Sequence, residues 1–346
     1  MPQLSFRILA ACALCALAGV LHAQTWVPDY SKVIDNAIER HILPGFDRFR
    51  VEAATLSSAS KACGNDEAPL RAAYHVAFDA WIDVAHLRLG PTETDNAAFA
   101  VAFWPDPKGH TTRALGALIR DRDPVVDDPK TFAEVSIAAR GFFALERLLF
   151  DPAFAGPADG YRCRLVGAIT GDISEIATRI HTDWQNTYAV VLCNPDGRLG
   201  FQDPKEVVQG LYSKLTTAAE FNMNARVRRP VGTNERARPK RAEAWRSNRS
   251  NRNIQRSLAA LETMFEDVFA NALPERAAII VRGEFYTIRR MADTLPKPMM
   301  ELVKDPAGRR KAIQIAFAYE ELLRRFDGLI RPSLGLSTVF NALDGD

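Results

Sequence analysis

The sequence lacks the signatures that usually identify a hydrolase, a membrane-spanning protein or a nucleic-acid-binding protein. It contains no His-Glu-x-x-His zinc pattern and no Gly-x-Ser-x-Gly nucleophile elbow. After residue 23, no stretch is long and apolar enough to cross a bilayer. The formal net charge is only +2 over 346 residues, which is too small to require a polyanionic partner. We therefore expect no nucleic-acid partner.

The N-terminus has the layout of a cleavable signal peptide over residues 1–23. Arg7 precedes an apolar run of about 14 residues, and Ala23 supplies the small residue before the predicted cleavage at Gln24. The run is too short to serve as a comfortable transmembrane anchor. We therefore predict export to the periplasm or cell envelope. Leu9-Ala10-Ala11-Cys12 also spells a lipobox, so lipidation of Cys12 is the less favoured alternative.

Three cysteines remain after the signal peptide, in a compartment where disulfides form. They are Cys63, Cys163 and Cys193, and none belongs to a Cys-x-x-Cys pair. One bridge and one leftover thiol are expected, and spacing alone does not choose the pairing. We favour Cys63 with Cys163 because each lies where a long helix begins.

Apolar residues recur at helical spacing in nearly every part of the chain, and alternating strand patterns are almost absent. Together with 47% hydrophobic and 25% charged residues, this predicts an all-α protein with a substantial core. Breaks rich in Pro and Gly separate the helices, and the break after Cys193 falls near the middle of the mature chain. We predict a two-lobed antiparallel helical bundle, with lobes at 24–193 and 194–346. Two of the predicted core stripes are Leu70, Tyr74, Ala77, Trp81 and Val84, and Leu165, Ile169, Ile173, Ile176, Ile180 and Trp184.

An aromatic segment at 99–106 should be irregular because Pro105, Pro107 and Gly109 interrupt any helix. Two interpretations stay open for its large side chains. They fill a gap between helices, or they form the wall of a ligand pocket. Trp104 and Asp106 are the ligand-binding candidates from this segment.

A second segment, 140–150, places a carboxylate in apolar surroundings. Phe142, Leu145 and Leu149 continue a stripe that starts at Val135, which predicts one helix from Val135 to Phe150. Glu146 lies among them, and burying it without a partner would cost several kcal/mol. It is either exposed or paired with a metal or an arginine. The candidate arginines are Arg140, Arg246 and Arg249.

A basic segment runs from Arg236 to Arg256. Its arginines at 246, 249, 252 and 256 would line one side of a helix. Such a side can be a solvated face, or it can neutralise buried carboxylates or hold an anion.

These segments, taken in order, resemble the imelysin-like family, and the resemblance covers nearly the whole mature chain. The matching stretches are Gly90-Pro91, Phe103-Trp104-Pro105-Asp106, Gly141-Phe142-Phe143-Ala144-Leu145-Glu146-Arg147-Leu148-Leu149-Phe150, Arg238-Pro239-Lys240-Arg241-Ala242-Glu243-Ala244-Trp245-Arg246-Ser247, Leu334-Gly335-Leu336 and Asn341-Ala342-Leu343-Asp344-Gly345-Asp346.

The resemblance implies an exported protein of two helical bundles, from a family named for a peptidase activity and tied more often to iron uptake. Its site motif is Gly-x-His-x-x-Glu on a helix. Gly141 and Glu146 match the motif, whereas Phe143 stands in the place of the histidine. A phenyl ring neither binds a metal nor moves a proton, which puts the metal site and the peptidase activity in doubt.

Three functional classes stay open from the sequence. The first is an envelope binding protein for a small ligand or metal ion, serving the acquisition of iron or another divalent metal with an envelope iron-transport system as partner. The second is a metal-dependent peptidase, for which the sequence names no catalytic residue. The third is a periplasmic scaffold that docks a membrane partner.

Overall fold

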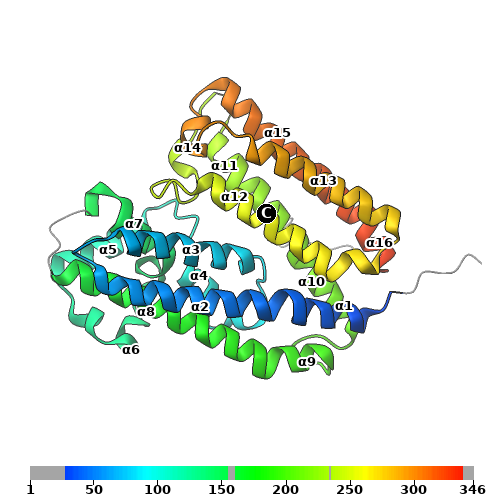
Figure 1. The fold of residues 1–346 in the computed structure, drawn as a ribbon, viewed down its shortest axis with the longest axis horizontal. Helices are drawn as coiled ribbons and strands as arrows, with labels where there is room; N and C mark the ends of the chain where they lie inside the picture. The colour runs from blue at the N-terminus through cyan, green and yellow to red at the C-terminus, as the bar shows by residue number, and fades with distance from the viewer. Residues whose placement is uncertain (1–27, 155–159, 234, 338–346) are drawn as a thin grey trace, which may run out of the picture.

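The computed structural model describes residues 28–154, 160–233 and 235–337. These residues form sixteen α-helices joined by short 3-10 and π segments, and they contain no strand (Figure 1). The prediction of an all-α helical bundle is therefore confirmed. None of the described helices is long and apolar enough to cross a bilayer. The predicted signal peptide and the alternative lipid site at Cys12 lie outside the described residues.

The first group of helices is built around α2 (Leu43–Ala59), which packs against α3 (Ala68–Val84) and α8 (Gly160–Asp183). The predicted stripes on α3 and α8 are buried, so they form core faces as expected. Figure 1 shows the shorter helices of this group around the long ones. They are α1 (Tyr30–Asn36), α4 (Ala97–Val101), α5 (His110–Asp121), α6 (Pro129–Phe132), α7 (Gly141–Phe150) and α9 (Ala189–Cys193).

The later helices form a second group in which α13 (Glu275–Asp293) packs against α15 (Pro306–Arg325). Helix α12 (Ser250–Met264) contacts both α13 and α3, so it joins this group to the first (Figure 1). The boundary at residues 193 and 194 stays a prediction. The remaining helices are α10 (Pro204–Phe221), α11 (Arg229–Val231), α14 (Met299–Leu302) and α16 (Arg331–Ser333).

The single helix predicted from Val135 to Phe150 is wrong. A 3-10 turn covers Ile137–Ala139, Arg140 is extended, and α7 begins at Gly141 with a φ of 71°. A Cβ atom at Gly141 would lie 2.2 Å from the carbonyl oxygen of Val101. Only glycine combines this left-handed conformation with so close a backbone approach. The break lets α7 start directly against α4.

The expected arginine face on one continuous helix is also only partly right. Helix α12 begins at Ser250, so Arg246 precedes it and Arg249 is its N-cap residue. The chain before α12 consists of turns, because Ala244 and Asn248 both adopt positive φ angles of 44° and 59°. These turns point the side chains of the basic segment in several directions.

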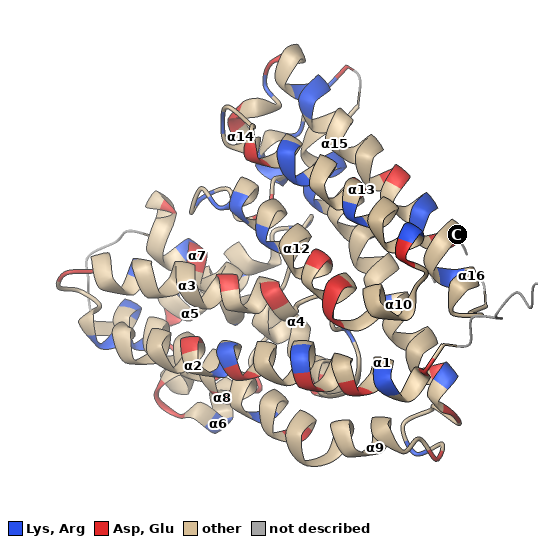
Figure 2. Ribbon diagram, turned by 45° about the vertical axis from the view of Figure 1, so that its right-hand side comes forward, with Lys and Arg blue, Asp and Glu red and all other residues tan. Residues whose placement is uncertain are grey.

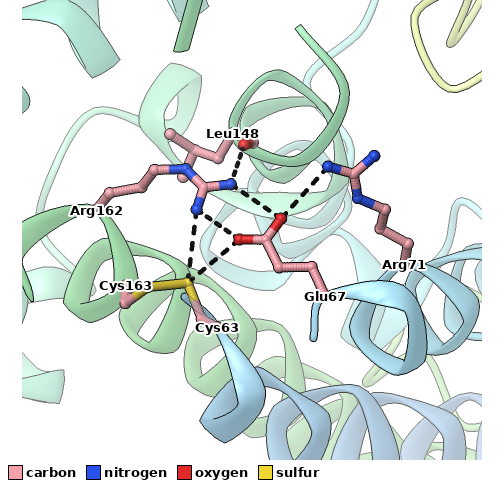
Figure 3. Close-up of a disulfide and its surroundings, with 6 residues drawn as sticks. All are labelled: Cys63, Glu67, Arg71, Leu148, Arg162 and Cys163. Carbon is pink, nitrogen blue, oxygen red and sulfur yellow. Dashed lines mark hydrogen bonds and ion pairs between the residues drawn. A yellow bond between two sulfur atoms is a disulfide. The ribbon is translucent and has the colours of Figure 1, made fainter. Parts of the chain in front are cut away.

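A disulfide joins Cys63, just before α3, to Cys163 in the first turn of α8 (Figure 3). This is the pairing that the sequence favoured, and Cys193 is left as an exposed free thiol. Beside the bridge, Arg162 donates to Glu67 at 2.6 Å and to the carbonyl oxygen of Leu148 at 2.7 Å. The bridge closes a loop of 100 residues, so its loss should cost about 2–5 kcal/mol.

Candidate functional site

Helix α7 places Glu146 inside the protein, where its side chain is 3% exposed. Phe142 and Leu145 bury the adjoining face of the helix in the core. Glu146 Oε1 accepts hydrogen bonds from Ser247, at 2.9 Å from the backbone nitrogen and 2.8 Å from Oγ. Burial raises the pKa of Glu146, and the hydrogen bonds from Ser247 offset only part of this effect.

The prediction that an arginine pairs with Glu146 is wrong. Each candidate forms its ion pair with another acid, and the three pairs are Arg140 with Asp172 at 2.6 Å, Arg246 with Asp151 at 2.6 Å and Arg249 with Asp79 at 2.5 Å. The turns before α12 aim the backbone N–H of Ser247 inward while the neighbouring arginines extend elsewhere. Glu146 therefore has hydrogen bonds but no ion pair with a described residue, and its pKa is raised where pairing would have lowered it.

Phe143 occupies the position of the family's motif histidine and packs among other rings. It stacks on Trp104 with centroids 6.2 Å apart and meets Phe78 edge-on at 5.5 Å. Phe143, Trp104 and Pro105 belong to the walls of two cavities. The aromatic segment predicted either to fill a gap or to line a pocket does both.

The larger cavity has a volume of about 650 Å³, opens to solvent, and is lined by segments far apart in the chain. Its apolar walls are rings from the 99–106 segment, from α7 and from the turns before α12. Glu146 and Asp106 are its acidic groups. Its basic groups outnumber them, and they are Arg147, Arg229, Arg236, Arg238, Lys240, Arg241, Arg246 and Lys304. We call this space the basic cavity.

Asp106, which lines the basic cavity, caps the first turn of α5. Its carboxylate accepts hydrogen bonds from the backbone nitrogens of His110 and Thr111, both at 2.9 Å, at the start of α5. Burial alone would raise the pKa of Asp106, but the hydrogen bonds from Thr111 and His110 outweigh it and lower the pKa. Asp106 is therefore an ionised helix cap that also faces the cavity.

The smaller cavity has a volume of about 390 Å³ and is mostly apolar. Its buried polar groups include the pair of Arg226 with Glu243, at 2.7 Å, and His86. His86 Nε2 lies 2.8 Å from Nε2 of His41. Burial, together with the neighbouring His41 ring and the positive charge of Arg226, lowers the pKa of His86 well below its usual range. We therefore expect His86 to be neutral.

The arginines at the start of α12 and within it favour one interpretation of the basic segment, the neutralisation of carboxylates. Arg249 and Arg252 both donate to Asp79, and Arg256 pairs with Asp83. Figure 2 shows acidic positions on α3 and basic positions on α12, which lie against each other. We call this contact the arginine–aspartate interface. Here the basic segment neutralises the buried carboxylate of Asp79 and the half-buried carboxylate of Asp83, while the side chain of Arg252 stays 51% exposed.

The surroundings of Glu146 do not fit a bare metal ion. Metal sites of proteins generally need three or more donor side chains. In the described ranges, no group of three His, Cys, Asp or Glu side chains is arranged to hold a metal. The charged groups that act on Glu146 are the cations Arg246 and Arg147. His110, at the start of α5, lies beside the cation Arg113.

Several site residues were missed from the sequence. Ser247, Trp245 and Arg241 belong to the basic motif before α12, and Arg229 precedes it. Treating the motif as helical hid their roles, because a helix would spread these side chains around its axis. The signal that could have revealed a turn is Asn248, since Asn adopts positive φ more readily than most residues.

The comparisons with known proteins agree with this architecture. The imelysin (peptidase M75) family model matches residues 42–325. An imelysin-like protein from Psychrobacter arcticum 273-4 has a similar structure with a TM-score of 0.75 and 16% identity, covering 91% of this chain and 99% of that one. A putative iron-regulated protein A precursor from Parabacteroides distasonis ATCC 8503 has a TM-score of 0.72 and 12% identity, covering 86% and 94%. Neither identity supports more than a shared fold, and no curated protein matches the sequence.

Proposed function

Because this chain belongs to the imelysin family, we propose that it is an exported binding protein of the cell envelope that serves iron acquisition, with its ligand in the basic cavity. The observation that carries the proposal is the cavity itself. Its volume of about 650 Å³ is in the range of small-molecule sites, and it combines aromatic walls with converging polar groups. The description of the Parabacteroides neighbour as iron-regulated supports the choice of iron.

Glu146 and Phe143 favour binding over peptide cleavage. A metal-dependent peptidase needs a metal held by several side chains, with a base beside its water. Glu146 offers one carboxylate, and its Oε1 is already engaged by Ser247. Phe143 supplies no ligand where the family motif has histidine. A ligand held by surface complementarity and hydrogen bonds needs none of these catalytic parts.

The proposal is tested by filling the basic cavity in cells. Ala237 is half-buried in the cavity wall, so Ala237→Trp should obstruct the space. Ala54→Trp, on the exposed side of α2, adds the same ring outside the cavity and serves as the matched control. We expect a deletion strain to grow poorly under iron limitation, and we expect wild type and Ala54→Trp, but not Ala237→Trp, to restore growth and iron uptake.

Two outcomes would reject the proposal. Equal rescue by both tryptophan variants would show that the cavity is not used, and a scaffold role would then be favoured. Metal-dependent cleavage of an unfolded protein by the purified wild type, abolished in Glu146→Ala, would replace binding by peptidase activity.

A further inference from the structure

The basic cavity contains a group of cations that have no acidic partner in the part of the chain that the structure describes. Of its basic residues, Arg147 and Arg246 pair with Asp151, and Lys304 pairs with Glu301. The other five form no ion pair with any described residue, and they are Arg229, Arg236, Arg238, Lys240 and Arg241. The two acids of the cavity do not compensate them, since Asp106 caps α5 and Glu146 binds Ser247.

Two of these cations are held close enough to repel each other. The pKa of Arg229 is lowered, first by burial and then by the positive charge of Arg241. Arg229 is half-buried and Arg241 is exposed, so solvent screens much of this repulsion, and what remains acts on the half-buried Arg229. A negatively charged group between the two guanidinium groups would remove the repulsion and supply their missing hydrogen-bond acceptors.

The backbone that carries these cations is constrained. Arg238 donates its backbone N–H to the carbonyl oxygen of Pro230 at 2.9 Å, and Thr233 donates to that of Arg236 at 3.1 Å. At Gly232, with a φ of 76°, an added Cβ would lie 2.2 Å from the carbonyl oxygen of Arg236. These two hydrogen bonds therefore tie the described residues on both sides of position 234 to each other and to α11. The arginines of this segment are presented from a preorganised backbone, which reduces the entropy lost on binding.

Aromatic rings complete the wall beside the unpaired cations. The Arg246 guanidinium lies 4.0 Å from the centroid of Trp245, and Lys240 Nζ lies 5.9 Å from it. Trp104 extends the aromatic surface through its stacking on Phe143. The cavity thus offers planar apolar surface next to donors suited to oxyanions.

From these observations we infer that the basic cavity binds a compact oxyanion bearing two or more carboxylate or phosphate groups, with Arg229 and Arg241 as its principal anchors. Arginine is the side chain best suited to such groups because its planar donors can bind both oxygens at once. The inference rests on the proposed function in one respect, namely that iron would enter this cavity as a negatively charged complex. A bare iron cation would meet five uncompensated positive charges and too few ligands.

Binding of four probes to the purified mature protein tests the inference, with calorimetry as the readout. The probes are ferric citrate, citrate, inorganic pyrophosphate and ferrous ion alone under anaerobic conditions. We expect ferric citrate and at least one free anion to bind, with an affinity that falls as salt is raised. Citrate and pyrophosphate then distinguish carboxylate from phosphate as the preferred group.

The decisive variant is Arg229→Gln/Arg241→Gln, which we expect to weaken anion binding at least tenfold. The matched control is Arg276→Gln/Arg290→Gln, which removes two exposed arginines of α13 that do not line the cavity. Ala237→Trp gives an independent check, because it blocks the cavity without changing its charge. The thermal midpoint of each variant is measured to confirm that it folds.

Equal anion affinity in wild type and in Arg229→Gln/Arg241→Gln would overturn the inference, and so would binding of ferrous ion alone with neither anion bound. The proposed function survives the second result, because the protein would still bind iron. A different result is also informative: anions bind to wild type and not to Arg229→Gln/Arg241→Gln, but deletion of the gene leaves growth under iron limitation unchanged. That result supports the anion site and rejects the role in iron acquisition.

Discussion

Arginine side chains gather in two neighbouring regions of this protein, and the two regions treat them differently. In the arginine–aspartate interface, Arg249 is 1% exposed and shares Asp79 with Arg252, while Arg256 pairs with Asp83. In the basic cavity, Arg229 and Arg241 have no acidic partner among the described residues. The first region is a structural contact, because folding pairs its arginines with aspartates. In the second region, the guanidinium groups of Arg229 and Arg241 can still donate hydrogen bonds to an anionic ligand. The comparison teaches that a structural arginine cluster differs from a candidate binding site in whether acidic side chains pair with the arginines. The number of arginines does not distinguish the two.

The largest expected change in the free energy of unfolding comes from removing the buried aspartate of the arginine–aspartate interface. Asp79→Ala would leave Arg249 buried without an ion pair, at a cost of about 3–5 kcal/mol in the free energy of unfolding. Arg252→Ala is the control at the solvent-facing end, where the side chain is 51% exposed, and should cost less than about 1 kcal/mol. Urea unfolding measures both. A cost below about 1 kcal/mol for Asp79→Ala would contradict the structural role of this interface.

Lowering the pH should reduce the stability of the protein at the arginine–aspartate interface, because it favours protonation of His75. Burial, followed by the charges of Arg249 and Arg252, lowers the pKa of His75 to about 4. The unfolded chain, with a pKa near 6.5, takes up this proton first, so the stability from neutral His75 is complete above about pH 6.5 and is lost as pH falls toward 4.

We expect a loss of about 1 kcal/mol between pH 7 and pH 5, after allowing for the partial exposure of His75. The measurement is urea unfolding of wild type and His75→Gln at both pH values. The variant should lose less stability than wild type, and equal losses would show that His75 does not carry this dependence.

A comparable effect is expected at Glu146, which borders the basic cavity. Ser247→Ala removes one of the two hydrogen bonds to Oε1 and should cost about 1–2 kcal/mol. Because burial raises the pKa of Glu146, its ionised form is less favoured in the folded protein than in the unfolded chain. Glu146→Gln removes that ionisation, so Ser247→Ala should be less costly when it is combined with Glu146→Gln. A double-mutant cycle by chemical unfolding measures the coupling, and additive costs would contradict it.

The smallest effect is expected in the basic cavity itself. Arg229→Gln/Arg241→Gln removes two cations that repel each other and have no acidic partners among the described residues, so stability should change by less than about 0.5 kcal/mol, or rise slightly. Thermal unfolding of the ligand-free protein checks this. A loss above about 2 kcal/mol would mean that these arginines are structural, and the contrast with the interface would fail.

Much of the fold could be predicted because helix formation and burial depend on residues three or four positions apart. The stripes on α3 and α8 were recognised in this way. The helix expected to start at Val135 failed because the left-handed conformation of Gly141 and its contact with Val101 are set by tertiary packing. Periodicity continues across such a break and does not reveal it.

The sequence by itself determined the all-α class, the core-facing positions of Phe142 and Leu145, and the cysteines best placed to form a bridge. Only the tertiary structure decided which groups meet. Ser247 reaches Glu146 across 101 residues of chain, and Asp79 reaches Arg249 across 170. Such pairings depend on the direction that the turns at Ala244 and Asn248 give to each side chain. The spacing of residues along the sequence does not predict that direction. Arg229 and Arg241 have no acidic partner among the described residues, and this is a property of the fold, so the candidate binding site emerged from the structure and not from the motif.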